Sequence, residues 1–250
     1  MIKQIPNIIT SLNLLCGCVA IFFAVSGDLI TASFFVFFGI FFDFFDGLAA
    51  RLLKAHSAIG LEFDSLADMI TSGVVPAIVM VQLMSQATQG TGIQLFAEDA
   101  EGMGWISGQF SLLPFIGLLI AVASGYRLAK FNVDTRQTDS FIGLPTPANT
   151  LLILSLPLIL HFQYSELAES IILNKWVLIG LTLVSCALLN AELRLFALKF
   201  KTWDIKSNSI RYIFLILCLV AIVLLKFIAI PAIILLYILM SLSWKEQSVR

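Results

Sequence analysis

The sequence predicts an all-α integral membrane protein, a bundle of about eight transmembrane helices with the N- and C-termini in the cytoplasm. Three observations support this class. Hydrophobic residues make up 59% of the 250 residues and charged residues only 12%, whereas soluble domains carry about 25% charged residues. The mean hydropathy is +0.98. The apolar residues also form continuous runs, not the alternating pattern of membrane-spanning strands.

The apolar runs are of the length needed to cross a membrane, which takes roughly 20 helical residues. In chain order we identify eight predicted spans: 8–26, 29–53, 63–85, 110–131, 145–164, 174–198, 208–227 and 228–243. The last two nearly meet at Lys226 and Phe227, so we expect a tight hairpin there. No small-residue cleavage site follows the first run, which is therefore expected to be retained. We expect no strands, and residues 1–250 form a single membrane domain.

The basic residues predict the orientation. With the N-terminus inside and eight crossings, all of the 15 Lys and Arg residues except Lys175 and Lys226 fall on the cytoplasmic side. This asymmetry follows the positive-inside rule for short loops. The net charge of −1 gives no reason to expect a nucleic acid partner.

Four aspartates lie where the second and third spans approach the cytoplasmic face. Asp43 and Asp46 are three residues apart, and Asp64 and Asp68 are four apart, so each pair shares one face of its helix. Carboxylates inside a membrane are costly and usually face the bundle interior or a wet cavity. The alternative is that they cap helices or pair with Lys and Arg. Capping by Asp64 is conceivable, but it cannot explain Asp43 and Asp46 within a helix.

Four carboxylates that face one another repel unless they are protonated or bind cations. Oxygen ligands suit Mg²⁺, Mn²⁺ or Ca²⁺, whereas zinc prefers His or Cys. Two ions held by four carboxylates indicate phosphoryl transfer, in which metal ions hold the attacking and leaving oxygens. Gly47 and Gly60 would let a ligand approach the backbone closely, and Arg51 can bind phosphate in bidentate fashion.

The pattern around these aspartates resembles the signature of the CDP-alcohol phosphotransferase family, Asp43-x-x-Asp46-Gly47-x-x-Ala50-Arg51, eight residues, then Gly60-x-x-x-Asp64-x-x-x-Asp68. The resemblance implies a membrane helical bundle that displaces CMP from a CDP-alcohol with two divalent cations, Mg²⁺ or Mn²⁺, with Ca²⁺ possible. It further implies that Asp43 and Asp64 contact both ions. Asp46 would complete one metal site, and Asp68 would complete the other. Asp68 would also take the proton of the acceptor alcohol.

Other stretches resemble the phosphatidylserine synthases of this family: PNIITSLNLLCG, FDSLADMITSGVVPA, RLAKFN and FIGLPTPAN. This similarity assigns residues 1–150 to the catalytic helices and 151–250 to scaffold or dimer helices. It implies transfer of the phosphatidyl group of CDP-diacylglycerol to L-serine, by a homodimer in the cytoplasmic or inner cell membrane with its active site facing the cytoplasm. The alternatives are another acceptor (glycerol 3-phosphate, inositol phosphate or choline) and, more remotely, a divalent cation transporter.

The resemblance also implies that Gly47, Arg51 and Ser57 contact the CDP group. Gly60 is expected to belong to the same site, because it would let the ligand approach the backbone closely. Asn7 and Thr10, at the start of the first span, are expected to hydrogen-bond cytidine or its ribose. Capping of the first helix by Asn7 is an equal alternative.

A serine site is expected at the end of the fourth span, where Arg127 and Lys130 lie three residues apart. The carboxylate of serine is expected to bind an Arg side chain. Its ammonium is expected to donate to an acceptor such as the amide oxygen of Asn132 or Asn13. The alternative is that Arg127 and Lys130 only anchor the span through the positive-inside bias.

Overall fold

The chain is almost entirely helical. The computed structural model describes residues 4–55, 57–93, 111–134, 140–196, 204 and 208–243. Within them the α-helices are α1 (Ile5–Val25), α2 (Leu29–Leu52), α3 (Ala58–Asp68), α4 (Val75–Gln89), α5 (Leu119–Val133), α6 (Thr146–Phe162), α7 (Glu166–Ile172), α8 (Lys175–Asn190), α9 (Ser209–Leu225) and α10 (Ala229–Ser243). A π-helical turn, η2 (Met69–Val74), joins α3 to α4, and 3-10 turns, η3 (Leu113–Leu118) and η4 (Lys226–Ile228), precede α5 and α10.

Several of these helices can cross a membrane, which confirms the predicted membrane class. Five segments of the described chain are long and apolar enough: Ile5–Val25, Leu29–Leu52, Ala58–Gln89, Leu113–Val133 and Ser209–Leu242. α7 and α8, which meet at a bend of 59°, form a sixth if they make one span. α6 is apolar but shorter. Helix thus occupies at least part of every predicted span, while the count of eight crossings and the orientation remain predictions.

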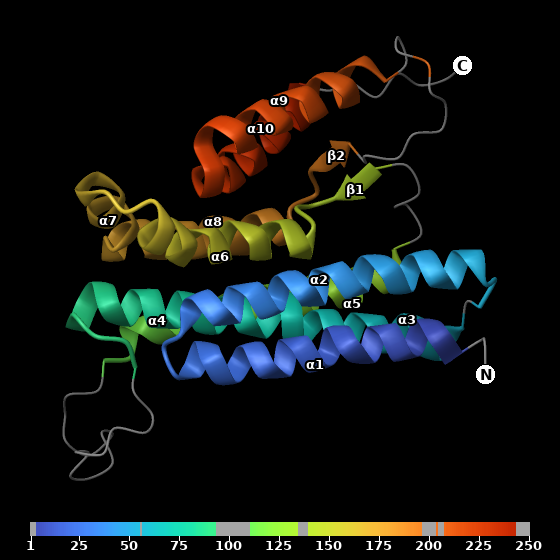
Figure 1. Ribbon diagram of the computed structural model, residues 1–250, viewed down its shortest axis with the longest axis horizontal. Helices are drawn as coiled ribbons and strands as arrows, with labels where there is room; N and C mark the ends of the chain where they lie inside the picture. The colour runs from blue at the N-terminus through green and yellow to red at the C-terminus, as the bar shows by residue number, and fades with distance from the viewer. Residues whose placement is uncertain are drawn as a thin grey trace.

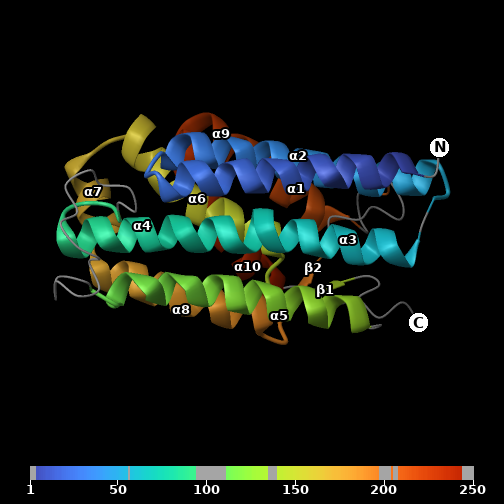
Figure 2. The same cartoon turned by 90° about the horizontal axis from the view of Figure 1, so that it is seen from below.

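The helices run alongside one another in an elongated bundle (Figure 1). α1 to α5 lie on one side, α6 and α8 lie next to them, and α9 and α10 lie outermost. The view from below shows α3 and α4 in line between the α1–α2 pair and α5 (Figure 2). The N-terminal end of α1, the turn between α2 and α3, and both strands lie toward the same end of the bundle. Buried apolar residues of α1, α2, α4, α6 and α8 form the main core.

The third predicted span starts earlier than expected. α3 begins at Ala58 because the hydroxyl of Ser57 accepts a hydrogen bond from the Gly60 N–H at 3.0 Å, as N-cap serines do. Asp64 therefore lies in the second turn of α3 and does not cap it. Because η2 continues the helix into α4, Asp64 and Asp68 belong to one helical segment of 32 residues.

Two short strands correct the expectation that the chain contains none. β1 (Ser140–Ile142) and β2 (Arg194–Phe196) pair antiparallel, with Phe141 opposite Leu195. The predicted span 174–198 ends as a helix at Asn190, because charged Glu192 and Arg194 interrupt its apolar run. The pairing joins the connection after α5 to the connection after α8.

The last two helices turn at the predicted position. Lys226 has φ +49°, and α9 and α10 contact each other. Gln163, just after α6, holds this turn: its side chain accepts hydrogen bonds from the N–H groups of Phe227 at 2.7 Å and Ile228 at 3.1 Å. α9 itself buries only Phe214, so its remaining apolar surface is available to lipid.

We predict that Gly143→Ala destabilises the connection between β1 and α6. Gly143 has φ +76°, and a Cβ there would lie 2.5 Å from the backbone oxygen of Leu189. A residue forced into this conformation costs about 1–3 kcal/mol, so thermal denaturation of the purified protein should show a Tm several degrees lower. Gly180→Ala, within α8 and with no atom within 4 Å of its new Cβ, is the control. Equal Tm values for the two variants would contradict the prediction.

Candidate functional site

Three of the four aspartates converge between α2 and α3. Carboxylate oxygens of Asp43, Asp64 and Asp68 lie within 4.8 Å of one another. Asp43 comes from α2, while Asp64 and Asp68 are four residues apart on α3 and face α2 together. All three side chains are half-buried. The spacing in the sequence therefore does place like charges against each other inside a helical bundle.

The cluster fits divalent cations. One carboxylate oxygen of Asp64, Oδ1, is buried and has no hydrogen-bond partner among the described residues. Within the described part of the chain, no Lys or Arg nitrogen lies within 4.0 Å of any of the four aspartates. The alternative that these residues form ion pairs is thus not observed. Carboxylate oxygens alone suit Mg²⁺, Mn²⁺ or Ca²⁺.

Asp46 lies beside the cluster and is held by α1. The residue is only 5% exposed, and its Oδ2 accepts a hydrogen bond from the Thr10 hydroxyl at 2.6 Å. A hydrogen bond to an ionised acceptor is among the stronger kinds. Thr10, predicted to contact cytidine, thus orients a predicted metal ligand.

Asp68 is held by a second pair of side chains. Its Oδ1 accepts a hydrogen bond from the Asn13 amide nitrogen at 3.3 Å, and the Asn13 amide oxygen accepts one from the Thr71 hydroxyl at 2.8 Å. Thr71 thereby fixes which side of the amide faces Asp68. The sequence predicts that the Asn13 oxygen accepts the ammonium of serine, but in this structure Thr71 occupies that oxygen. Thr71 itself was not identified from the sequence.

Small residues allow α1 and α2 to approach Thr71. A Cβ added to Gly17 would lie 2.6 Å from the Thr71 hydroxyl oxygen, and one added to Gly39 would lie 2.6 Å from the Thr71 Cγ2. Both distances are too short for real atoms, so only glycine fits. The sequence signal for this contact is a glycine on each of the first two helices.

A hollow of about 140 Å³ adjoins the carboxylates, between the N-terminal part of α1, the C-terminal part of α2 and the start of α3. Its lining brings together five residues predicted to surround CDP, together with two of the aspartates: Asn7, Thr10, Gly47, Ser57, Gly60, Asp46 and Asp64. Arg51 is exposed on the last turn of α2 and is not part of the lining. The alternative role for Asn7 is wrong, because α1 begins at Ile5 and Gln4 is its N-cap residue.

The residues predicted to bind serine do not form one group. Arg127 is buried, and its Nη1 donates to the Thr146 hydroxyl at 2.8 Å. Asn132 exchanges hydrogen bonds with Ser65. Lys130 forms an ion pair with Glu192 at 3.5 Å and so faces α8 and its following connection.

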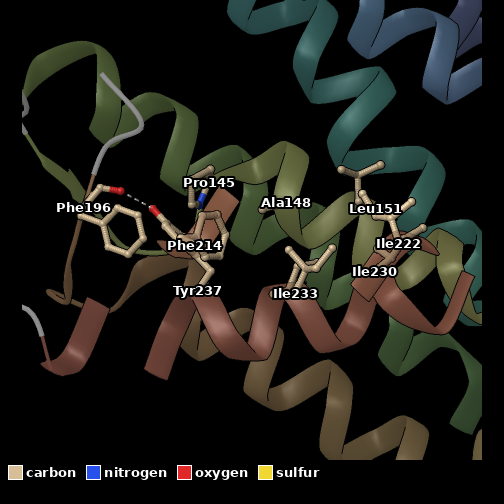
Figure 3. A pocket seen from close by; sticks show the side chains of 10 residues that line it. Pro145, Ala148, Leu151, Phe196, Phe214, Ile222, Ile230, Ile233 and Tyr237 are labelled. Atoms are coloured by element: carbon tan, nitrogen blue, oxygen red, sulfur yellow. Dashed lines mark hydrogen bonds between the residues drawn. The ribbon is translucent and has the colours of Figure 1, made fainter. Parts of the chain in front are cut away.

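A separate apolar cavity of about 440 Å³ lies between α6, β2 and the α9–α10 pair (Figure 3). Pro145, Phe196, Phe214 and Tyr237 line one end of it. The Tyr237 hydroxyl donates to the backbone oxygen of Phe196 at 3.0 Å, so this polar pair is satisfied internally. The cavity is suited to hydrocarbon and not to a charged group.

Comparison with known proteins gives consistent results. A sequence model of the family described as CDP-alcohol phosphatidyltransferase matches residues 3–188. A CDP-diacylglycerol–serine O-phosphatidyltransferase of Bacillus subtilis is 34% identical over 173 residues, 68% of this chain and 81% of the relative. The enzyme of the same name from Helicobacter pylori strain 26695 is 30% identical over 220 residues, 86% of this chain and 81% of the relative. A Saccharomyces cerevisiae enzyme of that name is 33% identical over 134 residues, 50% of this chain and 40% of the relative.

We predict that Thr71→Val lowers any catalytic turnover that depends on the orientation of Asp68. The change removes the hydroxyl that fixes the Asn13 amide, so Asn13 no longer holds Asp68 in one orientation. One hydrogen bond contributes about 0.5–1.5 kcal/mol, which corresponds to a fall in kcat of roughly twofold to tenfold.

The control is Thr182→Val, which removes another buried threonine hydroxyl that donates to the backbone oxygen four residues earlier. Steady-state kinetics of both variants test the prediction. A kcat for Thr71→Val equal to that of Thr182→Val would show that the Asn13 orientation does not matter.

Proposed function

The chain belongs to the CDP-alcohol phosphatidyltransferase family, and we propose that it transfers the phosphatidyl group of CDP-diacylglycerol to the hydroxyl of L-serine. The products are phosphatidylserine and CMP. One observation carries the chemistry: carboxylates from α2 and α3 converge within a membrane bundle, at the positions of the family signature. The acceptor is supported by the curated relatives, several of which are named as serine O-phosphatidyltransferases.

The four carboxylates hold two divalent cations in this proposal. Asp43 and Asp64 would serve as ligands in both cation sites, Asp46 in one of them and Asp68 in the other. The buried, unpartnered Oδ1 of Asp64 supports this assignment. Bound there, Mg²⁺ or Mn²⁺, or alternatively Ca²⁺, supplies the positive charge that neutralises the diphosphate during transfer.

The hollow beside the carboxylates receives the CDP group. Gly47 lies open on α2, since a Cβ there would meet no atom within 4 Å, and a phosphate can approach the helix closely at this point. Ser57 and Asn7 both approach Gly60 closely, because a Cβ on Gly60 would be 2.9 Å from the Ser57 hydroxyl and 3.1 Å from the Asn7 amide oxygen. Arg51, exposed at the end of α2, is free to swing toward the diphosphate.

In the proposed reaction, the serine hydroxyl oxygen attacks the lipid-linked phosphorus in line with the leaving CMP. The new P–O bond forms as the P–O bond to CMP breaks, and Asp68 accepts the hydroxyl proton. Asn13 and Thr71 position Asp68 for that transfer. Positioning and electrostatic stabilisation account for most of the rate in phosphoryl transfer.

The same proposal places the enzyme in the cell membrane with eight crossings, both termini in the cytoplasm and the active site facing the cytoplasm. The distribution of Lys and Arg supports this orientation. Residues 1–150 carry the site, residues 151–250 provide scaffold, and two chains form a homodimer. A single Arg127 near the site favours serine as the acceptor. A phosphorylated acceptor would need additional cationic side chains around its phosphate.

We predict that activity depends on a divalent cation held by Asp43 and Asp64. Chelation should abolish CMP release, and Mg²⁺ or Mn²⁺ should restore it. Asp43→Asn and Asp64→Asn should each lower kcat by roughly two orders of magnitude or more, because each removes charge that stabilises the transition state. Asp28→Asn is the control, since Asp28 is the exposed N-cap residue of α2. Near-normal turnover in the Asp43 or Asp64 variant would exclude the two-metal assignment.

The acceptor is tested with purified protein, CDP-diacylglycerol, Mn²⁺ and a panel of alcohols. We expect CMP release with L-serine far above the water background, and little with glycerol 3-phosphate, inositol phosphate or choline. Radiolabelled serine should appear in the lipid fraction in equal amount to CMP. If glycerol 3-phosphate supports release and serine does not, the acceptor is wrong while the family chemistry stands. If a divalent ion is transported and no acceptor releases CMP, the enzyme assignment itself fails.

A further inference from the structure

Buried polar side chains gather one helical turn beyond Asp68, where η2, α5 and α6 meet. They are Ser72 on η2, Ser124 and Arg127 on α5, and Thr146, Asn149 and Thr150 on α6; each is at most 7% exposed. We call these six residues the polar cluster. Ser72 follows Asp68 by four residues, so both face the same side of their helix.

Hydrogen bonds and close contacts show that these elements touch one another. Arg127 on α5 donates to the Thr146 hydroxyl on α6 at 2.8 Å. Thr150 on α6 donates to the backbone oxygen of Ser72 at 2.8 Å. A Cβ on Gly73 would lie 3.3 Å from the Cβ of Ser124, so η2 packs closely on α5. The polar cluster is therefore one contiguous region.

Four members of the polar cluster have buried atoms without a partner among the described residues. These atoms are both amide atoms of Asn149, the hydroxyl oxygens of Ser72 and Ser124, and Nε of Arg127. Buried polar groups are normally hydrogen-bonded, and leaving one unpaired costs about 1–3 kcal/mol. Within a membrane bundle, polar groups of this kind mark sites that bind a substrate or an ion. Both donors and acceptors are left free here.

The backbone supports the same interpretation. η2, which carries Ser72, is a π-helical turn inside an otherwise continuous helix. Such turns are rare and occur frequently at functional sites. Because η2 follows directly on Asp68, a ligand in the polar cluster lies next to the proposed proton acceptor.

We propose that the polar cluster binds the α-carboxylate and α-ammonium groups of the acceptor amino acid, with Asn149 as the specificity-determining residue. The carboxylate pairs with the Arg127 guanidinium and accepts hydrogen bonds from the hydroxyls of Ser72 and Ser124. The ammonium donates to the amide oxygen of Asn149. This places the acceptor's hydroxyl on the side of Asp68. The inference rests on the proposed function. It replaces Asn132 and Lys130 as predicted serine-binding residues, because Asn132 contacts Ser65 and Lys130 contacts Glu192.

Asn149→Ala tests the proposal through two acceptors, L-serine and hydroxypropionate, the analogue that lacks the amino group. Loss of a hydrogen bond to a charged group weakens binding by roughly tenfold or more. We expect the KM for serine to rise about tenfold, with the KM for CDP-diacylglycerol and the kinetics with hydroxypropionate within twofold of wild type. Asn190→Ala, which removes a partly buried amide on α8, is the control. It should leave the KM for serine, the KM for CDP-diacylglycerol and the kinetics with hydroxypropionate unchanged.

Ser124→Ala provides a variant that does not depend on Asn149. The Ser124 hydroxyl has no partner among the residues that the structure describes, so removing it should leave the Tm unchanged or higher, while the KM for serine rises severalfold. If Ser124 had only a structural role, its replacement would not raise the KM for serine while the Tm stays unchanged. A fall in kcat/KM by the same factor for serine and hydroxypropionate in Asn149→Ala, or an unchanged KM for serine in both variants, overturns the proposal. The cluster would then hold buried water. The proposed function fails separately, if wild-type protein does not use serine.

Discussion

Four carboxylates held close together inside a membrane bundle are the constraint on which the structure depends. Oxygens of Asp43, Asp64 and Asp68 lie within 4.8 Å of one another, and no described Lys or Arg nitrogen lies within 4.0 Å of them. In a low-dielectric interior such repulsion is not screened by water. Divalent cations and the diphosphate of a substrate would complete the charge balance, and the same charges would serve phosphoryl transfer.

The packing of the first four helices follows from this constraint. α1 supplies Thr10 to Asp46 and Asn13 to Asp68, so it must lie against both helices that carry the carboxylates. Gly17 and Gly39 make this possible by leaving room for Thr71. The π-helical turn then directs Ser72 toward α5 and α6, where the polar cluster begins. Two of the proposed metal ligands, Asp64 and Asp68, thus lie on the same continuous helical segment as Ser72 of the proposed acceptor pocket.

Sequence reasoning was sufficient where the information is local. Spacings of three and four residues place Asp43 with Asp46 and Asp64 with Asp68 on helix faces, and apolar runs predict the helices. Contacts between distant segments were not predictable. Thr10 meets Asp46 across 36 residues and Asn13 meets Asp68 across 55, so two predicted substrate contacts are contacts to carboxylates in the structure. Lys130 meets Glu192, and β1 meets β2, only because of how α5 and α8 pack. No sequence pattern marked Asn149, because its proposed role rests on buried amide atoms that have no partner among the described residues.

The central claim, that the carboxylates bind divalent cations before any chemistry occurs, is tested most directly by metal binding. Mn²⁺ titrated into purified, chelator-treated protein without nucleotide can be followed by electron paramagnetic resonance, which detects the free ion. We expect saturable binding in wild-type protein, displacement by Mg²⁺, and an affinity lower by about tenfold or more in Asp64→Asn. Absence of saturable binding, or equal binding by wild type and Asp64→Asn, would contradict the account.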